Sequence, residues 1–177
     1  MPITAQQLLQ ILPNAGAKAV VFAPALNTAM GRYQIVGLQR VAAFIAQIGH
    51  ESGQLRYVRE LWGPTPAQAR YEGRADLGNV MPGDGFRFRG RGLIHITGRA
   101  NHAECGEALG LDLISHPESL EHPEWAAKSA AWFWSTRGLN TLADTGAFDK
   151  ITSRINGGQN GAEERRKLYD RALEVLA

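Results

Sequence analysis

Apolar residues recur at helical spacing near both ends of the chain, and this spacing is lost in the middle. The clearest case is segment 38–52, where the apolar positions follow a period near 3.6 and predict one buried helix, ended by Gly53. These positions are Leu38, Val41, Ala42, Ile45 and Ile48, with Phe44 beside them.

Residues that start or stop helices mark the remaining elements. Thr4 and Gln7 form a capping box for the first helix, which Pro13 ends. We expect Asn14 to cap a second helix and Pro24 to begin a third. Besides 38–52, helices are predicted over residues 4–12, 14–22, from 24 onward, 100–109, 123–137, 147–155 and 162–176.

The segment between residues 53 and 98 is too rich in glycine and proline for long helices. Two short pieces, 86–88 and 93–97, are expected to pair as a small sheet. The sequence therefore predicts a mainly α fold, with residues 1–177 as a single domain that contains a small irregular β-containing region. Long irregular segments in compact domains are often functional, so we expect residues 49–101 to hold the site.

The composition is that of a globular domain, with 44% hydrophobic and 20% charged residues. The formal net charge of +2 is compatible with an anionic substrate and too small to indicate nucleic-acid binding. The lone cysteine, Cys105, excludes an internal disulfide and a Cys-rich zinc site, and we expect it to be a small buried residue. No apolar run approaches the roughly 20 residues of a membrane span, so no membrane insertion is expected.

Two carboxyl groups stand at the start of the irregular segment. Glu51 closes the predicted helix and Glu60 follows nine residues later. A continuous helix would put them on opposite faces, but Gly53 lets the chain turn and bring Glu60 across from Glu51. Glycoside hydrolysis needs such a pair, one carboxyl to protonate the leaving oxygen and one carboxylate to activate water. The residues alone leave open two surface glutamates near a turn.

The pair of His50 and Glu51 also matches the start of a zinc-protease motif. That motif needs a second histidine where this chain has Gln54. We therefore expect no metal and no cofactor, because zinc spacing is equally absent from the other histidines, His95, His102, His116 and His122.

Basic and aromatic residues alternate over residues 86–91. In a strand, this places the arginines on one face and Phe86 and Phe88 on the other, in the core. The arginines would then orient a carboxylate or meet an anionic polymer.

The four tryptophans are candidates for stacking on sugar rings. Trp62 lies two residues after Glu60 and just before a glycine, which makes it the candidate sugar platform. Trp132 and Trp134 are expected in the core and at its edge.

Several ordered motifs add to these features. They are residues 44–53 (FIAQIGHESG), 83–101 (GDGFRFRGRGLIHITGRAN), 129–134 (SAAWFW) and 154–158 (RINGG). Together they resemble glycoside hydrolase family 19, the chitinase-like family that includes many phage and pyocin-type endolysins. The resemblance covers about residues 38–175. It implies a lysozyme-like, two-lobed helical fold around a cleft, and an inverting mechanism.

The resemblance assigns the catalytic roles. It makes Glu51 the general acid and Glu60 the general base. Thr97 matches the hydroxyl residue that helps hold the nucleophilic water. A glutamate further along, Glu72, is a second candidate for the base that ranks below Glu60.

Substrate-binding residues follow from the same resemblance. Asn101 and Asn156 match the asparagines that bind the acetamido sugar, and Arg165 matches the arginine that pairs with the acid–base network. His50, beside the general acid, and Trp62 complete this set.

Two positions depart from the family pattern. His95 stands where the family commonly has glutamine, and His102 where it commonly has tyrosine. We include His95 among the substrate-binding residues, because it keeps hydrogen-bonding capacity. A histidine at the cleft also makes a different pH dependence possible.

The chain has neither the disulfides of plant chitinases nor an attached chitin- or wall-binding module, which favours the bacteriolytic branch. We therefore expect an endolysin-type muramidase that hydrolyses the β-1,4 bonds between MurNAc and GlcNAc in peptidoglycan. The alternatives are a chitinase acting on GlcNAc polymers, a lytic transglycosylase that needs one carboxylate, and a non-catalytic cell-wall-binding module.

Residues 1–10 lack the basic start of a signal peptide. The expectation is cytoplasmic accumulation, release through a holin-type pore, and antimicrobial action on the cell wall from the periplasm. The expected partner is the glycan strand of peptidoglycan. No large apolar stripe demands another subunit, so we expect a monomer.

Overall fold

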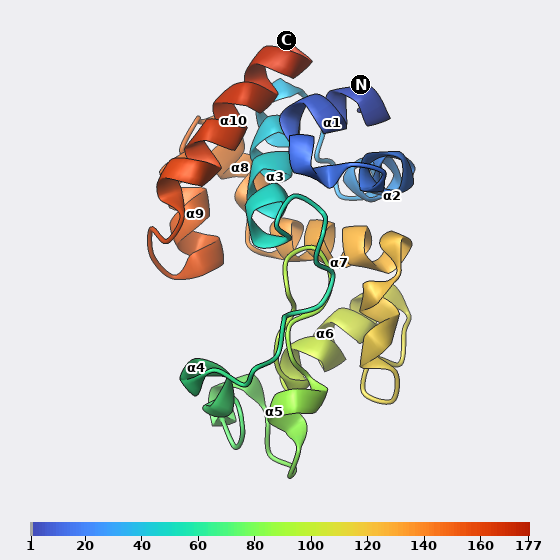
Figure 1. Cartoon of the computed structure of the whole chain (residues 1–177), viewed down its shortest axis with the longest axis vertical. Helices are drawn as coiled ribbons and strands as arrows, with labels where there is room; N and C mark the ends of the chain where they lie inside the picture. The colour runs from blue at the N-terminus through green and yellow to red at the C-terminus, as the bar shows by residue number, and fades with distance from the viewer. Residues whose placement is uncertain (1) are drawn as a thin grey trace.

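The computed structural model describes residues 2–177 and shows a helical protein of two parts joined by extended connections (Figure 1). The larger part is a helix bundle of α1 (Ala5–Ile11), α2 (Lys18–Arg32), α3 (Leu38–Glu51), α7 (Pro123–Thr136), α8 (Leu139–Asp144), α9 (Phe148–Asn156) and α10 (Ala162–Leu176). The small lobe carries α4 (Pro66–Ala69), α5 (Asp84–Arg87) and α6 (Arg99–Leu109). Short 3-10 turns lie at η1 (Pro13–Ala15), η2 (Ala75–Leu77) and η3 (Pro117–Glu121).

Helix α3 lies at the centre of the bundle because its residues are apolar or small on nearly every side. All nine residues from Val41 to Gly49 are buried, and α3 packs along α10 and α8. A side chain added at Gly49 would meet Leu12 Cδ2 at 2.6 Å, so a glycine is needed for this close approach. Phe44 packs edge-on against Trp134, with ring centroids 5.4 Å apart.

Most of the predicted helix boundaries are confirmed. Helix α3 ends at Glu51, and Gly53 follows with a φ of 56°. The capping box of Thr4 and Gln7 is present at the start of α1. Because glycine has no Cβ to clash in the left-handed region, it also follows α6, α7 and α9, at Gly110, Gly138 and Gly157.

The prediction of two helices over residues 14–24 and beyond is wrong, because α2 is one helix that runs through Pro24. Asn14 lies in the turn η1 and caps no α-helix. A proline inside a helix costs roughly 3 kcal/mol. The buried face of α2, with Phe22 before the proline and Leu26 after it, continues across this point. Burying each such side chain is worth about 1.5–3 kcal/mol, which offsets that cost.

Residues 86–88 do not form the predicted strand. Gly83, with a φ of 89°, precedes the short helix α5, and this helix takes up Phe86. Phe88 is fully buried whereas Phe86 is 52% exposed, so the prediction that both lie in the core is wrong. The alternation of basic and aromatic residues falls on a helical turn, in which neighbours do not take opposite faces.

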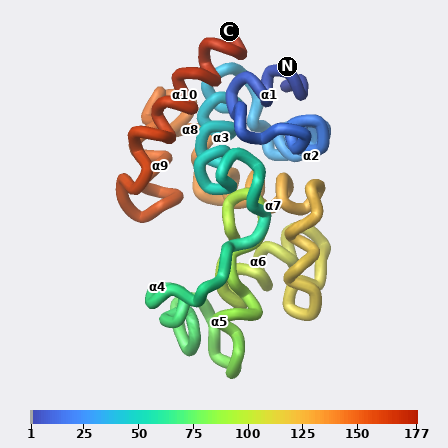
Figure 2. Tube along the Cα trace, in the orientation of Figure 1, coloured from blue at the N-terminus to red at the C-terminus, as the bar shows by residue number. Residues whose placement is uncertain are grey.

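Within residues 2–177, strand pairing is limited to two isolated antiparallel bridges, which link Arg59 to Arg91 and Arg91 to Ile96. The backbone N–H of Glu60 also donates to the carbonyl of Gly90 at 2.8 Å. These contacts hold side by side the two segments that join the bundle to the small lobe (Figure 2). The small sheet expected in this region is reduced to these bridges.

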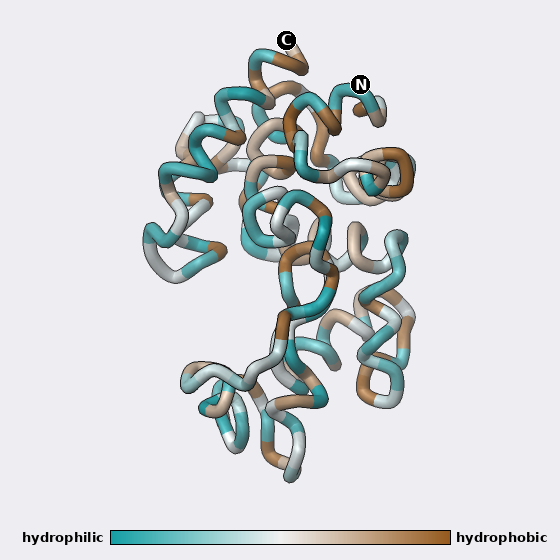
Figure 3. Tube along the Cα trace, in the orientation of Figure 1, coloured by the Kyte–Doolittle hydropathy of each residue, from teal (hydrophilic) through white to brown (hydrophobic). Residues whose placement is uncertain are grey.

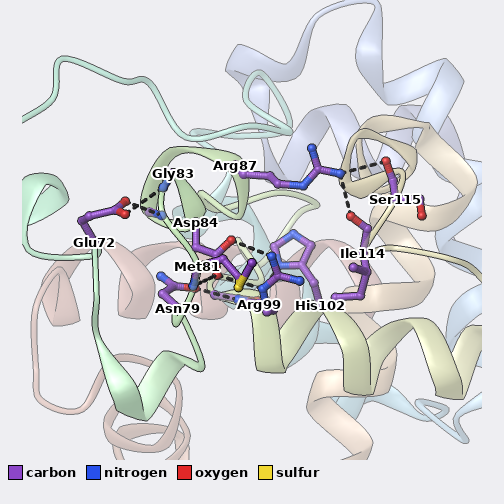
Figure 4. A network of polar contacts seen from close by, with 12 residues as sticks. Glu72, Asn79, Met81, Gly83, Asp84, Arg87, Arg99, His102, Ile114 and Ser115 are labelled. Carbon is purple, nitrogen blue, oxygen red and sulfur yellow. Dashed lines mark hydrogen bonds and ion pairs between the residues drawn. The ribbon is translucent and has the colours of Figure 1, made fainter.

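Polar contacts hold the tip of the small lobe together (Figure 4). The carboxylate of Glu72 accepts hydrogen bonds from the backbone N–H groups of Gly83 and Gly85, at 2.8 and 3.0 Å. The buried Asp84 receives two hydrogen bonds of 2.8 Å from Arg99. These bonds hold the pKa of Asp84 below its ordinary value. A lobe built in this way depends on a satisfied polar network more than on an apolar core.

Hydropathy follows the packing of the bundle. Hydrophilic residues dominate along α10, with apolar positions on the side that meets the bundle (Figure 3).

Cys105 is fully buried as predicted, and burial raises the pKa of its thiol to about 12. No helix within the described residues combines the length and apolar character needed to cross a bilayer.

His102 is a buried histidine that the fold keeps neutral. Its Nδ1 lies 2.8 Å from the carbonyl of Gly98, and its Nε2 has no hydrogen-bond partner among residues 2–177. Burial lowers the pKa of His102 from 6.5 to about 4. The ring packs against Phe88, with centroids 5.2 Å apart.

This histidine predicts acid sensitivity of the fold. The unfolded chain binds the proton first, so the free energy of unfolding falls as pH drops from 6.5 to about 4, by up to about 3 kcal/mol. Urea denaturation across this range should show a flatter pH dependence for His102→Phe than for the wild type. Measurement at pH 8, where His102 is neutral in the folded and the unfolded chain, gives the pH-independent cost of the substitution as the control. An equal slope in His102→Phe would contradict this assignment.

Candidate active site

A cavity of about 280 Å³ lies where the bundle meets the small lobe. The end of α3, the segment 94–97, the start of α6 and the ends of α7 and α9 bound it. Five residues predicted for the site line this cavity, namely Glu51, His95, Thr97, Asn101 and Asn156.

Glu51 is the last residue of α3, so the central helix of the bundle places it at the cavity. Its Oε1 accepts a hydrogen bond of 2.6 Å from Arg165, and its side chain is 21% exposed. Its Oε2 makes no hydrogen bond within residues 2–177. One oxygen is therefore fixed by a guanidinium, and the other is available to a ligand.

Arg165 lies behind Glu51 and is only 1% exposed. Besides Glu51, its guanidinium donates to Gln47 Oε1 at 2.5 Å and to the carbonyl of Asn160 at 3.0 Å. The amide of Gln47 in turn donates to Thr152 Oγ1 at 2.9 Å. A buried guanidinium with this set of partners holds the carboxyl of Glu51 in one position and ties α3 to α9 and α10.

Glu60 stands on the connection to the small lobe and is held by three donors. Its Oε1 accepts from Gln68 Nε2 at 3.0 Å and from Tyr71 Oη at 3.1 Å. Its Oε2 accepts from the backbone N–H of Gly90 at 2.9 Å. Burial first, and then the charge of Glu60, raises the pKa of Tyr71 to about 12, so the phenol keeps its proton and donates it. All three bonds are accepted by carboxyl oxygens of Glu60 and fix its side chain in one position.

Gly90 brings Glu60 and Thr97 close together. A methyl group placed on Gly90 would lie 3.3 Å from Glu60 Oε2, 3.3 Å from Thr97 Oγ1 and 2.9 Å from His95 Cβ. The carboxylate and hydroxyl oxygens are therefore no more than twice 3.3 Å apart. Thr97 lines the cavity with Glu51, so Glu60 lies close to that cavity without being one of its lining residues.

His95 lies close enough to both glutamates for their charges to act on its ring. Its backbone has a φ of 57°, and its Nε2 is buried without a hydrogen-bond partner among the residues described. Burial is the largest influence and lowers the pKa of His95, whereas the charges of Glu51 and Glu60 and the backbone of Tyr57 raise it. The imidazole is thus neutral near pH 7 and lies within the electrostatic reach of both glutamates.

The two asparagines predicted to bind an acetamido group line the same cavity. The Asn101 amide N–H donates to the carbonyl of Thr97 at 2.8 Å, which fixes the side chain and leaves its oxygen available. Asn156 ends α9, just before Gly157 with its φ of 77°. Both are suited to hydrogen-bond a sugar substituent, because each amide offers donors and an acceptor.

Besides Glu60, three predicted residues do not line the cavity. His50 interacts through Nδ1 with Glu164, and a side chain added at Gly161 would run into its ring. Trp62 packs on Tyr71 and Phe86, with ring centroids 6.1 and 5.4 Å away. Arg165, the third, acts from behind through Glu51. Glu72, the second candidate for the base, is occupied with the glycine N–H groups of the small-lobe tip.

Sequence reasoning missed several residues of the site. Phe133 of α7 and Arg137, which follows this helix, line the cavity, although only their helix was predicted; Trp132, expected in the core, lines it as well. Gln68 and Tyr71, the partners of Glu60, were not identified either. One sequence pattern could have pointed to Gln68. Thr65 and Gln68 form a capping box, which fixes this turn.

Within residues 2–177, no three His, Cys, Asp or Glu side chains come together in a way that could hold a metal ion.

Sequence comparisons find relatives from one family. The class I chitinase profile of glycoside hydrolase family 19 matches residues 15–169. A glycosyl hydrolase family 19 domain-containing protein of Haemophilus influenzae is 35% identical over 179 residues, covering 85% of this chain and 86% of that protein. An endochitinase of Arabidopsis thaliana is 34% identical over 125 residues, which span 70% of this chain and 41% of the plant protein.

Solved structures show the same fold. A bacterial family 19 chitinase has a TM-score of 0.79 at 24% identity, over 100% of this chain and 96% of its own. Chitinase C of Streptomyces griseus has a TM-score of 0.78 at 25% identity, over 98% of this chain and 76% of its own. The chain belongs to glycoside hydrolase family 19 and is a glycosidase. The predicted family and the mainly helical, lysozyme-like fold are confirmed.

The packing around Gly90 predicts that this position is intolerant of a side chain. Gly90→Ala should push His95, Thr97 and Glu60 apart, and displacements of this size cost about 100-fold in rate. The measurement is the rate of glycoside hydrolysis, with circular dichroism to check folding. The control is Gly31→Ala, because Gly31 lies in α2 with no atom within 4 Å of the added methyl. A folded Gly90→Ala with wild-type activity would show that these three side chains need not be held together.

Proposed function

We propose that this protein is an endolysin-type muramidase that hydrolyses the β-1,4 bond between N-acetylmuramic acid and N-acetylglucosamine in peptidoglycan. The observation that carries this choice is charge, because residues 53–100 contain eight arginines and four acidic residues. Chitin is uncharged, whereas peptidoglycan carries carboxylates on its lactyl groups and peptides. A positively charged lobe beside the cleft attracts the charged polymer and speeds its binding.

Part of this charge is concentrated near Glu60. Burial lowers the pKa of Arg89, and the neighbouring guanidiniums of Arg91 and Arg59 lower it further. The carboxylate of Glu121 is shared by Arg91, at 3.1 Å, and Arg59, at 3.5 Å. Arg89 makes no ion pair within the described part of the chain, so this side of the cleft keeps an excess of positive charge.

Glu51 supplies the acid in the proposed mechanism. Its Oε2, the oxygen that Arg165 does not hold, carries the proton and donates it to the glycosidic oxygen as the bond to the anomeric carbon breaks. The carboxylate left on Glu51 is then paired with the buried guanidinium of Arg165. This ion pair stabilises the charge that forms on the acid during the reaction.

Glu60 supplies the base. A water held between Glu60 Oε2 and Thr97 Oγ1 loses its proton to the carboxylate and attacks the anomeric carbon from the face opposite the leaving group. Asn101 and Asn156 hold the acetamido group of the sugar. Attack by water in a single displacement inverts the configuration of the anomeric carbon.

Chitin hydrolysis is the second candidate, because relatives from plants are named endochitinases and a similar solved structure is a chitinase. The same acid, base and asparagines would act on an uncharged polymer of N-acetylglucosamine. The excess of arginine in residues 53–100 would then have no negatively charged substrate group to bind.

The decisive experiment treats outer-membrane-permeabilised Gram-negative cells with wild type, Glu51→Gln and Glu60→Gln. Loss of either carboxylate should reduce the lysis rate by about 10²- to 10⁴-fold, because each removes one proton transfer. Mass spectrometry of the soluble fragments should find muropeptides with reducing MurNAc ends. The control is Glu107→Gln, an exposed residue of α6 outside the cavity.

Other outcomes each contradict part of the proposal. Fragments with 1,6-anhydro ends and an active Glu60→Gln would mean a lytic transglycosylase. No lysis by folded wild type, together with cleavage of chito-oligosaccharides, would mean a chitinase. Absence of both activities would leave a wall-binding module.

A further inference from the structure

Arg137 is a charged residue of the cavity that the acid–base mechanism does not use. It follows the last residue of α7 and lines the cavity together with Glu51 and Asn156. The backbone carbonyl of Arg137 accepts a hydrogen bond of 3.0 Å from Arg154, which brings a second guanidinium close to this edge. The edge is therefore positively charged.

The guanidinium of Arg137 is held in place without being neutralised. It lies over the ring of Phe133, 3.5 Å from the centroid, and Nη1 donates to Thr136 Oγ1 at 3.2 Å. Within residues 2–177 it makes no ion pair. Burial lowers the pKa of Arg137, and the more distant charge of Glu104 is the influence that opposes this.

The other ionisable side chains of the cavity do not offset this charge. Glu51 is already paired with Arg165, and burial keeps His95 neutral. A guanidinium has five N–H donors in a planar fork, and Arg137 uses one of them on a described residue. The remaining donors match a group with two acceptor oxygens and a negative charge.

We propose that Arg137 determines specificity by binding a carboxylate of peptidoglycan, on the lactyl group or on the peptide attached to it, while the glycan occupies the cleft. This inference rests on the proposed function. It predicts preference for a charged over an uncharged glycan, because an arginine left unpaired in a half-buried cleft favours the ligand that neutralises it.

The test combines one enzyme variant with one substrate modification. The kcat/KM of wild type and of Arg137→Gln is measured on intact peptidoglycan and on peptidoglycan whose carboxylates have been converted to amides. Amidation should lower the wild-type value about tenfold. In Arg137→Gln the same amidation should lower the value several times less than in the wild type, because the contact of Arg137 is already lost and only the attraction of the positively charged lobe remains.

Three controls sharpen this test. Arg70→Gln removes an exposed arginine whose side chain makes no hydrogen bond or ion pair with the described residues, and it should respond to amidation as the wild type does. Arg137→Lys keeps the charge but not the fork and should lie between wild type and Arg137→Gln. Thermal unfolding of each variant separates a lost contact from a lost fold.

A second pair of substrates separates the two sources of the carboxylate. Amidase-stripped glycan strands expose the lactyl carboxylate alone. If amidation of these strands lowers the wild-type kcat/KM about tenfold, Arg137 binds the lactyl group. If only amidation of intact peptidoglycan lowers it, Arg137 binds the peptide. Equal responses to amidation in wild type and folded Arg137→Gln on both substrates would overturn the inference and leave the proposed function standing. No cleavage of any peptidoglycan by the wild type would overturn both.

Discussion

The buried guanidinium of Arg165 is the interaction on which the arrangement of the site depends. A charged side chain that is 1% exposed is tolerated only where its donors are satisfied. Its partners come from different elements: Glu51 and Gln47 lie on α3, and Asn160 precedes α10. Satisfying Arg165 therefore fixes the end of the central helix relative to α10, and with it the carboxyl of the proposed acid. The bonds of Arg165 thus both hold the bundle together and position the proposed acid.

The two glutamates of the site are positioned by different physical means. Glu51 is fixed by helix packing and a buried ion pair, whereas Glu60 is fixed by hydrogen bonds from Gln68, Tyr71 and the backbone of Gly90. Helix packing makes the first position rigid. The second depends on irregular backbone and on a lobe held by polar networks, so any change in this lobe also moves the proposed base. This difference suits a cleft in which the acid is fixed and the water-activating group lies across it.

Sequence patterns predicted the features that depend on neighbouring residues, such as where a helix lies and where it ends. The period of 3.6 and the glycine at position 53 were enough for α3 and for the place of Glu51. Local patterns failed where packing outweighed propensity, as in α2, where the buried face runs through Pro24, and at Phe86, where α5 replaces a strand. The contacts of Gln68 with Glu60 and the place of Arg137 in the cavity bring together residues that no spacing relates. Such contacts follow from the tertiary fold.

The central claim is that Glu51 and Glu60 act as acid and base on opposite sides of one glycosidic bond, with a water between them. Proton NMR of the earliest products tests this most directly, because direct attack by water inverts the anomeric carbon of a β-linked substrate. The account predicts that the α-anomer of the new reducing end appears first and then equilibrates with the β-anomer. Initial formation of the β-anomer, or of a 1,6-anhydro product without a reducing end, would contradict it.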